Sequence, residues 1–262
     1  MSGATIRGGR LFPKSSHRSF IIAIDHGLMM GVPEGAEDVR GVLSQIVDWG
    51  PDGVLMSPGV LQHVGDLFAH RGAPSVILRV DLFALDSRVR RERDQYRLLA
   101  DPEDAVRLGA DALAMMLVLG APDEVFADNA AAVARLAERA HRVGVPLIVE
   151  VTTWGQHASK EADPALLTYG CRVAAELGAD LIKTPFTGDI PSMTALIHGC
   201  PVPVLVLGGP RANNDDELLD STQEALDAGA RGLIYGRNIW QASDPIKLTR
   251  ALRELLESGP PS

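Results

Sequence analysis

Short apolar runs rich in β-forming residues recur along the 262-residue chain, and each is followed by a longer segment with helical periodicity. This alternation predicts parallel strands covered by helices. The first run is not followed by a G-x-G-x-x-G phrase, which disfavours a dinucleotide-binding fold. There are eight runs: Phe20–Asp25, Gly53–Ser57, Ser75–Asp81, Ala112–Leu117, Pro146–Val151, Asp180–Thr184, Pro203–Leu207 and Gly232–Tyr235.

Eight strand-helix units without a linker favour a closed, single-domain (β/α)8 TIM barrel over an open sheet. We expect the barrel over residues 19–258, an N-terminal extension over 1–18 and a C-terminal tail over 259–262. Glycines in repeated Gly-Ala phrases, at Gly109, Gly178 and Gly229, mark the ends of helices. Helices are expected near residues 35–49, 59–70, 101–109, 122–143, 163–178, 190–198, 214–229 and 244–257. The stretch 82–100 is expected to form a long loop of the kind that often acts as a lid.

The charge distribution argues against nucleic acid as a partner, because the formal net charge is −9 and no Lys/Arg-rich block stands apart. The most basic stretch, 88–93, fits a solvated surface or a contact with an anionic substrate or a subunit. Cys171 and Cys200 lack metal-type spacing, and we find neither a signal-peptide pattern nor an apolar run long enough to cross a bilayer. These features predict a cytoplasmic protein without a membrane partner.

Polar residues that end the apolar runs are candidates for the active site, because the active site of a (β/α)8 barrel lies at the carboxyl ends of its strands. Arg79 and Asp81 end the third run, and we expect them to bind substrate. Glu150 and Thr152 end the fifth run and are candidate catalytic residues. All of these side chains should face one cavity.

Lys183 is the most informative residue, since it lies inside the apolar run Leu181–Pro185. Burial favours the neutral form of a lysine side chain, and a neutral amine can attack a carbonyl carbon to form an imine. The alternative is a lysine paired with Asp25 or Glu150 for structural reasons only. The phosphate-binding features described next favour the catalytic interpretation.

Glycine-rich turns follow the seventh and eighth runs, as Gly208-Gly209-Pro210-Arg211 and Gly236-Arg237-Asn238. The corresponding loops of (β/α)8 barrels frequently bind phosphate. Glycines allow backbone N–H groups to approach phosphate oxygens, and Arg211 and Arg237 are candidate cationic partners. Either turn alone would fit a simple loop, but together they predict a phosphate site.

Asp25 ends the first run, where a carboxylate could transfer protons or hold substrate hydroxyls; the alternative is a structural ion pair with Lys183 or Arg79. His26 is a candidate substrate-binding residue. It has no second His or Cys ligand nearby in the sequence, so we expect no metal and no cofactor. Trp154 follows the fifth run and is a candidate wall of the substrate pocket.

Four segments resemble the archaeal-type class I aldolases, also called DhnA-like or FbaB-like: 24–27 (IDHG), 178–189, 202–211 and 229–241. The resemblance spans nearly the whole chain in order. It implies a homo-oligomeric barrel in which Lys183 forms the imine, Asp25 transfers protons, and Gly208, Gly209, Gly236 and Arg237 hold a phosphate. Members act on phosphorylated keto compounds and include fructose-bisphosphate aldolase, amino-dideoxy-heptulosonate phosphate synthases and a thiolase for a phosphorylated pentanedione.

One departure from the family pattern concerns the general acid. Aldolases and synthases of this family carry a tyrosine after the fifth strand, in a Tyr-Pro-Arg-Gly phrase, whereas this chain reads Thr152-Thr153-Trp154-Gly155. Candidates for the missing acid are Glu150, Thr152, His157 and Tyr96. The leading hypothesis is a class I aldolase acting on a phosphorylated ketose or a dihydroxyacetone-phosphate-like donor. The alternatives are a thiolase acting on a phosphorylated diketone, an aldol-type synthase of secondary metabolism, and a non-catalytic phosphosugar-binding protein.

Overall fold

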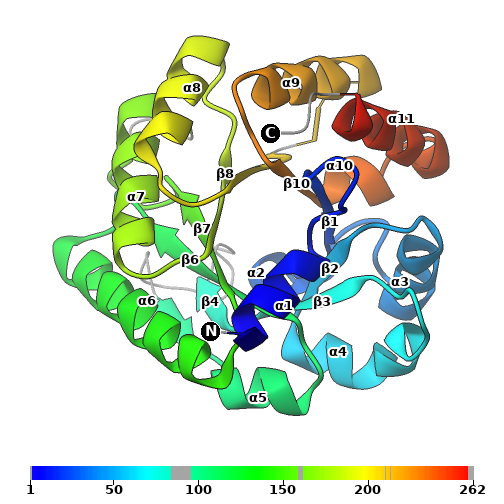
Figure 1. Ribbon diagram of the computed structural model, residues 1–262, viewed down its shortest axis with the longest axis horizontal. Coiled ribbons are helices and arrows are strands. Elements are labelled where there is room, and N and C mark those ends of the chain that lie inside the picture. The colour runs from blue at the N-terminus through cyan, green and yellow to red at the C-terminus, as the bar shows by residue number, and fades with distance from the viewer. Residues whose placement is uncertain (1, 84–95, 159–161, 210, 213, 259–262) are drawn as a thin grey trace.

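Eight parallel strands close into a barrel in the computed structural model, which describes residues 2–83, 96–158, 162–209, 211–212 and 214–258 (Figure 1). Helices cover the outside of the barrel, so the predicted (β/α)8 fold is confirmed. Around the barrel the strands follow the order β1 (Ser19–Ala23), β10 (Gly232–Tyr235), β9 (Val204–Leu207), β8 (Leu181–Pro185), β7 (Leu147–Thr152), β6 (Ala112–Val118), β3 (Ser75–Arg79) and β2 (Gly53–Met56).

The outer helices begin at capping residues that the sequence contains. Ser57, Asp163 and Asp244 each accept a hydrogen bond from a backbone N–H of the first turn and are followed by proline, whose fixed φ suits the first helical position. These helices are α3 (Val39–Asp48), α4 (Pro58–Val64) with the 3-10 turn η1 (Gly65–Phe68), α5 (Pro102–Arg107), α6 (Asp123–Val143), α7 (Pro164–Glu176), α8 (Ile190–Gly199), α9 (Asp215–Asp227) and α11 (Pro245–Glu257).

The interior of the barrel is layered. Side chains of a strand alternate between the helix-covered outside and the interior, so residues two apart point the same way. The lower interior layers are apolar, and the side chains two positions further along β3, β7 and β8 are Arg79, Glu150 and Lys183. A polar layer therefore lies above an apolar base formed by Leu11, Ile21, Ala23, Leu55, Ile77, Ala112, Ala114, Ile148, Leu181, Leu205 and Ile234.

The N-terminal segment closes the lower end of the barrel. Residues Ser2–Arg10 form helix α1, which lies across the barrel end that faces the viewer in Figure 1. Arg7 donates a hydrogen bond to the carbonyl oxygen of Gly144, at 2.7 Å. Leu11 follows the helix, is fully buried and packs against the apolar base. The sequence predicted only an extension here, because the glycine-rich run SGATIRGGR has a low helix propensity that contact with the barrel overrides.

We expect Leu11→Ala to lower the free energy of unfolding by about 2–5 kcal/mol, the usual cost of truncating a buried leucine. The measurement is urea denaturation. Ile6→Ala is the matched control, since Ile6 lies on the same segment but is 59% exposed; its effect should stay within about 0.5 kcal/mol. Equal effects of the two substitutions would show that Leu11 does not close the barrel base.

Four further short elements were not predicted. Residues 82–100 were expected to form a loop, but β4 (Asp81–Phe83) and β5 (Tyr96–Leu98) pair in antiparallel fashion at its two ends, and 84–95 lie outside the described residues. Helix α2 (Gly27–Met30) follows β1, and helix α10 (Arg237–Trp240) follows β10. Both short helices begin within four residues of a strand end, so they shape the upper end of the barrel.

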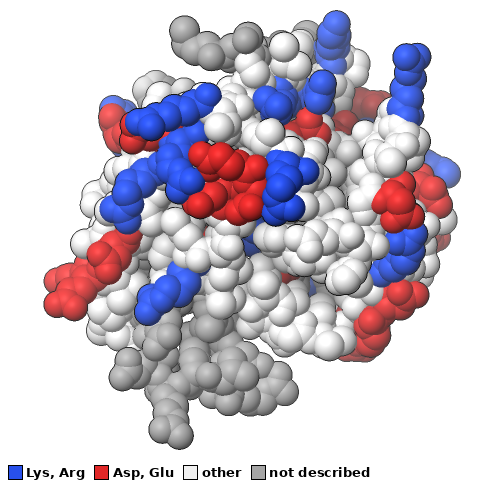
Figure 2. All heavy atoms as spheres, turned by 90° about the horizontal axis from the view of Figure 1, so that it is seen from below, with Lys and Arg blue, Asp and Glu red and all other residues white. Residues whose placement is uncertain are grey.

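Acidic and basic side chains are interspersed on the face shown in Figure 2, so this face does not carry charge of a single sign. Exposed ion pairs such as Arg139–Asp101 contribute little to stability. Within the described chain, no helix has the length and apolar character required to cross a membrane.

Candidate active site

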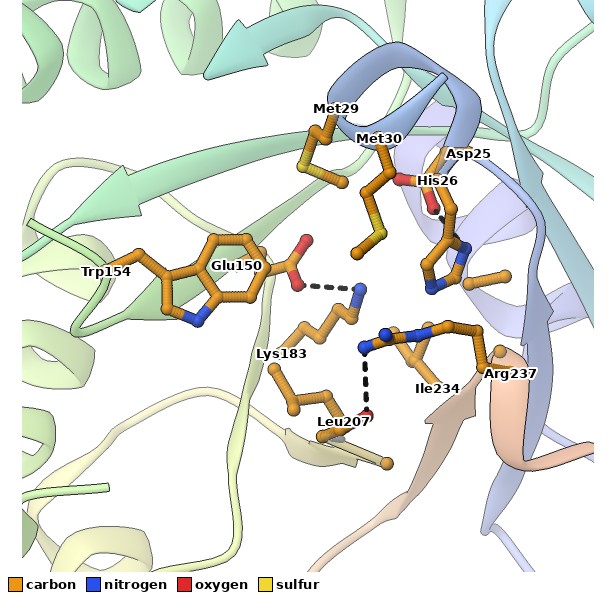
Figure 3. Close-up of a pocket in the computed structure, with 14 residues that line it drawn as sticks. Asp25, His26, Met29, Met30, Glu150, Trp154, Lys183, Leu207, Ile234 and Arg237 are labelled. Carbon is orange, nitrogen blue, oxygen red and sulfur yellow. Dashed lines mark hydrogen bonds and ion pairs between the residues drawn. The ribbon is translucent and has the colours of Figure 1, made fainter. Parts of the chain in front are cut away.

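A cavity of about 350 Å³ opens at the carboxyl ends of the strands. Most of the predicted site residues line it, together with Met29 and Met30 of α2, which the sequence analysis did not identify (Figure 3). No sequence signal marked these methionines, because only the packing of α2 turns them toward the cavity. The lining residues are Ala23, Asp25, His26, Met29, Met30, Glu150, Trp154, Lys183, Leu207, Gly208, Gly209, Ile234, Gly236 and Arg237.

Lys183 and Glu150 form an ion pair inside this cavity. Strands β7 and β8 are paired so that Glu150 lies directly beside Lys183, and both side chains point into the barrel. The Nζ atom of Lys183 lies 2.8 Å from Oε1 of Glu150, and both side chains are buried. Figure 3 shows the two groups pointing toward one another, with Arg237 and His26 on the other side of the lysine.

Arg79 lies behind this pair and binds three carboxylates. Its Nε donates to Oδ2 of Asp25 at 2.7 Å, Nη1 donates to Oδ1 of Asp81 at 3.3 Å, and Nη2 donates to Oε2 of Glu150. Asp81 also accepts a hydrogen bond from the backbone N–H of Met116, at 2.6 Å. Arg79 and Asp81 are not among the cavity-lining residues of the described chain, so the structure does not bring them to the position that the sequence analysis expected.

Burial and the neighbouring charges shift the pKa values of the three carboxyl groups in this cluster in different directions. Burial opposes the ionisation of Asp25, but the charges of Arg79 and Lys183 outweigh it and lower the pKa of Asp25 to about 2. Burial opposes the ionisation of Glu150 as well, and Lys183 and Arg79 hold its pKa below the usual value. For Asp81, burial outweighs the attraction of Arg79 and raises the pKa to about 6. Asp25 and Glu150 are therefore carboxylates at neutral pH.

We expect Asp81 to make the folded state more stable as the pH falls from about 6 toward 4. Its folded pKa lies above the unfolded value of 3.8, so the folded state binds the proton first; one such group contributes at most about 1.4 kcal/mol per pH unit. Asp81→Asn should remove this component in urea denaturation between about pH 4.5 and 7. Asp25 stabilises the fold above pH 3.8 and loses this effect only toward pH 2, outside the window. An unchanged pH dependence in the variant would contradict the prediction.

The two glycine-rich turns meet beside Lys183. Asn238 joins them, because its Nδ2 donates to the carbonyl oxygen of Gly208 at 2.7 Å and its Oδ1 accepts from the N–H of Ala212 at 2.8 Å. A side chain at Gly236 is excluded, since a Cβ atom there would lie 2.3 Å from Cε1 of His26. The sequence analysis noted Asn238 in the second turn but did not predict that it joins the two turns.

Arg237 extends from the second turn into the cavity (Figure 3). Its Nη2 donates to the carbonyl oxygen of Gly209 at 3.4 Å, and its buried Nε has no hydrogen-bond partner within the described chain. His26 packs edge-on against Trp240 with ring centroids 5.6 Å apart, and burial lowers its pKa against the attraction of Asp25. The cavity thus offers a guanidinium N–H and a neutral imidazole near the lysine.

Several candidates lie away from the cavity wall as far as the structure describes it: Thr152, Arg211, His157 and Tyr96. Arg211 and His157 are exposed, and Tyr96 is buried in β5. Thr152 is fully buried, and its hydroxyl has no hydrogen-bond partner among the described residues. The basic stretch 88–93 lies outside the described residues. The part of the chain that can be described contains no cluster of His, Cys, Asp or Glu suited to a metal ion.

Known proteins match this chain over nearly its whole length. The family model for DeoC/LacD family aldolases matches residues 19–242. An uncharacterised aldolase of Saccharolobus solfataricus is 36% identical, over 99% of this chain and 96% of its own. A 2-amino-4,5-dihydroxy-6-oxo-7-(phosphonooxy)heptanoate synthase of Streptomyces griseus is 32% identical, over 97% of this chain and 90% of its own.

Solved structures agree with these matches. An archaeal fructose-1,6-bisphosphate aldolase superposes on this chain with a TM-score of 0.86. That structure was solved with the catalytic lysine covalently bound to the carbinolamine intermediate of the substrate. The two chains are 29% identical, and the superposition covers 97% of this chain and 100% of the other. The resemblance noted in the sequence is confirmed: the chain belongs to the DeoC/LacD family of aldolases and is an imine-forming class I lyase.

Proposed function

We propose that Lys183 attacks the ketone carbon of a phosphorylated donor, either a dihydroxyacetone-phosphate-like compound or a phosphorylated ketose, and that a C–C bond forms or breaks beside the resulting imine. The observation that carries this proposal is the pairing of a buried lysine amine with Glu150, at 2.8 Å, in a cavity whose other side carries Arg237 and three glycines. The Streptomyces griseus relative is named for a phosphorylated product, which supports a phosphorylated substrate.

Glu150 is placed to move the proton that imine formation requires. The ammonium group of Lys183 first gives a proton to Oε1 of Glu150, and the neutral amine then adds to the ketone. When the carbinolamine loses its hydroxyl as water, Glu150 returns the proton, so the positive charge ends on the iminium nitrogen. In this scheme Glu150 takes over the acid role that the family assigns to the missing tyrosine.

Asp25 is suited to the step after imine formation. The iminium group withdraws electrons from the neighbouring carbon, so a carbanion there is stabilised as an enamine. Asp25 lines the cavity as a carboxylate, because Arg79 and Lys183 keep its pKa near 2 against the effect of burial. It can therefore accept a hydrogen bond or a proton from a substrate hydroxyl when the C–C bond breaks.

The phosphate of the donor fits between the two glycine-rich turns. Gly208, Gly209 and Gly236 line the cavity without side chains, which leaves their backbone open to a ligand. The buried Nε of Arg237 has no hydrogen-bond partner among the described residues, and a phosphate oxygen would supply one.

We expect Arg237→Ala to raise KM for a phosphorylated donor by about 10- to 100-fold, the value of a charge-assisted hydrogen bond. The matched control is the unphosphorylated ketone dihydroxyacetone, whose weaker reaction should change little in the variant. Steady-state kinetics with both compounds would test this expectation. An equal loss for the two ketones would mean that Arg237 supports the site as a whole rather than the phosphate.

Imine trapping tests the proposal directly. The wild-type protein is treated with borohydride in the presence of dihydroxyacetone phosphate or fructose-1,6-bisphosphate, and the intact mass is measured. A stable adduct located on Lys183 by peptide mass spectrometry supports the proposal. Absence of an adduct with a wider panel of phosphorylated ketones would contradict it.

A thiolase acting on a phosphorylated diketone is the second candidate, and the composition of the cavity wall favours it. Met29, Met30 and Trp154 form the wall near Lys183, and they offer few hydrogen-bonding groups to the hydroxyls of a sugar (Figure 3). An acyl group would fit such a wall better. Production of acyl-coenzyme A from a phosphorylated diketone and coenzyme A would establish this activity, whereas an aldehyde product would favour the aldolase.

A further inference from the structure

We propose that Arg79 is a positioning residue that acts on Lys183 through Glu150. By binding Oε2 of Glu150 it directs Oε1 toward the lysine amine, so that Glu150 is held where it can exchange a proton with that amine. This inference rests on the proposed function, because it assigns Arg79 a part in making Lys183 nucleophilic.

The geometry separates Arg79 from the substrate and joins it to the lysine. Arg79 is only 1% exposed, it is absent from the described cavity wall, and all three of its nitrogens donate to carboxylates. Glu150 lies between the two cations, with one oxygen on Arg79 and the other 2.8 Å from Lys183. The planar guanidinium fork fixes the orientation of the carboxylate, which a single point charge would not do.

Glu150 lies between two cations, Lys183 and Arg79, which together hold its pKa below the usual value against the effect of burial. A carboxylate shared by two cations attracts each of them less than it attracts a single partner, and burial strengthens all of these interactions. Loss of Arg79 would leave Oε2 of Glu150 without its guanidinium partner, so the carboxylate could turn away from the orientation in which Oε1 faces Lys183. The other ionisable or charged groups that face this cluster from neighbouring elements are Asp25, His26, Asp81, Tyr96 and Arg237.

A small carbonyl probe measures the reactivity of Lys183 independently of the natural substrate. Formaldehyde with cyanoborohydride methylates free amines, and peptide mass spectrometry distinguishes Lys183 from the other lysines, with the exposed Lys247 as internal reference. At neutral pH we expect Arg79→Met to slow the methylation of Lys183 by about tenfold or more relative to Lys247, since a proton-transfer group that is no longer held in position commonly loses a factor of this size. Unfolding would expose Lys183 and accelerate its methylation, which is the opposite direction.

Three further variants separate positioning from general support of the fold. Asp81→Asn removes a carboxylate that accepts a hydrogen bond from Arg79 but is not bonded to Glu150 or Lys183. This variant should change the methylation rate of Lys183 by less than about threefold. Arg79→Lys restores the positive charge without the planar fork and should recover little of the lost rate. Arg79→Gln retains hydrogen-bond donors but has no charge, and Lys183 should be methylated in it as slowly as in Arg79→Met. It replaces Arg79→Met in the experiment if that variant does not fold.

The outcomes also separate this inference from the proposed function. Equal methylation of Lys183 in the wild type and in Arg79→Gln would overturn the positioning role, as would an equally large effect of Asp81→Asn. Failure of the wild type to form a borohydride-trapped adduct with phosphorylated ketones would overturn the proposed function instead. The methylation rates would still test whether Arg79 positions Glu150, because they do not depend on the natural substrate.

Discussion

Replacement of Lys183 by alanine should abolish the borohydride-trapped adduct and lower kcat by about 10⁴-fold or more, the scale on which loss of a nucleophile reduces catalysis. Without the amine the substrate cannot be converted into an imine, so the electron sink that stabilises the carbanion is lost. Intact-mass spectrometry after trapping and steady-state assays of C–C cleavage would measure the two effects. Both losses should appear together, because both depend on the same covalent bond.

The control for this experiment is the exposed Lys247, whose replacement by alanine should leave the adduct and the turnover unchanged. Folding of Lys183→Ala is also expected to persist, since Glu150 keeps its bond to Arg79 and remains paired. Circular dichroism would verify this. An adduct that persists in Lys183→Ala would place the imine on another lysine and overturn the proposed mechanism.

The barrel and the placement of Glu150 and Lys183 in its interior were predictable because both depend on short-range periodicity. Strand residues alternate with a period of two, and a charged residue two positions beyond an interior apolar residue must also face the interior, as Glu150 follows Ile148 and Lys183 follows Leu181. The carboxyl ends of all eight strands meet at one end of the barrel, so these residues were expected to converge.

The partners of Arg79 were not predictable in the same way. The sequence places Arg79 at a strand end, where it would fit a substrate-binding role, but its three carboxylate partners come from the segment after β1, from β4 and from β7. Only the three-dimensional structure shows that each of its three nitrogens donates to one of these carboxylates and that Arg79 is absent from the described cavity wall. Long-range packing likewise decides that Leu11 reaches the barrel base and that Met29 lines the pocket.

Glu150→Gln is expected to slow the formation of the trapped adduct by about 10²- to 10⁴-fold, the usual contribution of a positioned proton-transfer group. The glutamine amide keeps the size of the side chain and can still accept a hydrogen bond from Arg79. It cannot take the proton from the ammonium group or return it to the departing hydroxyl. Rapid-quench borohydride trapping with dihydroxyacetone phosphate would measure the rate.

Asp25→Asn provides the matched comparison, because Asp25 also binds Arg79 and lines the cavity but makes no hydrogen bond to Lys183 within the described chain. We expect this variant to form the adduct within about tenfold of the wild-type rate and to lose C–C cleavage, since in the proposed mechanism the carboxylate of Asp25 acts only after the imine has formed. Adduct formation at the wild-type rate in Glu150→Gln would show that Glu150 is only a structural partner of Lys183 and does not transfer its proton. Equal slowing of adduct formation in both variants would mean that the charge of the cluster, rather than proton transfer by Glu150, controls the lysine.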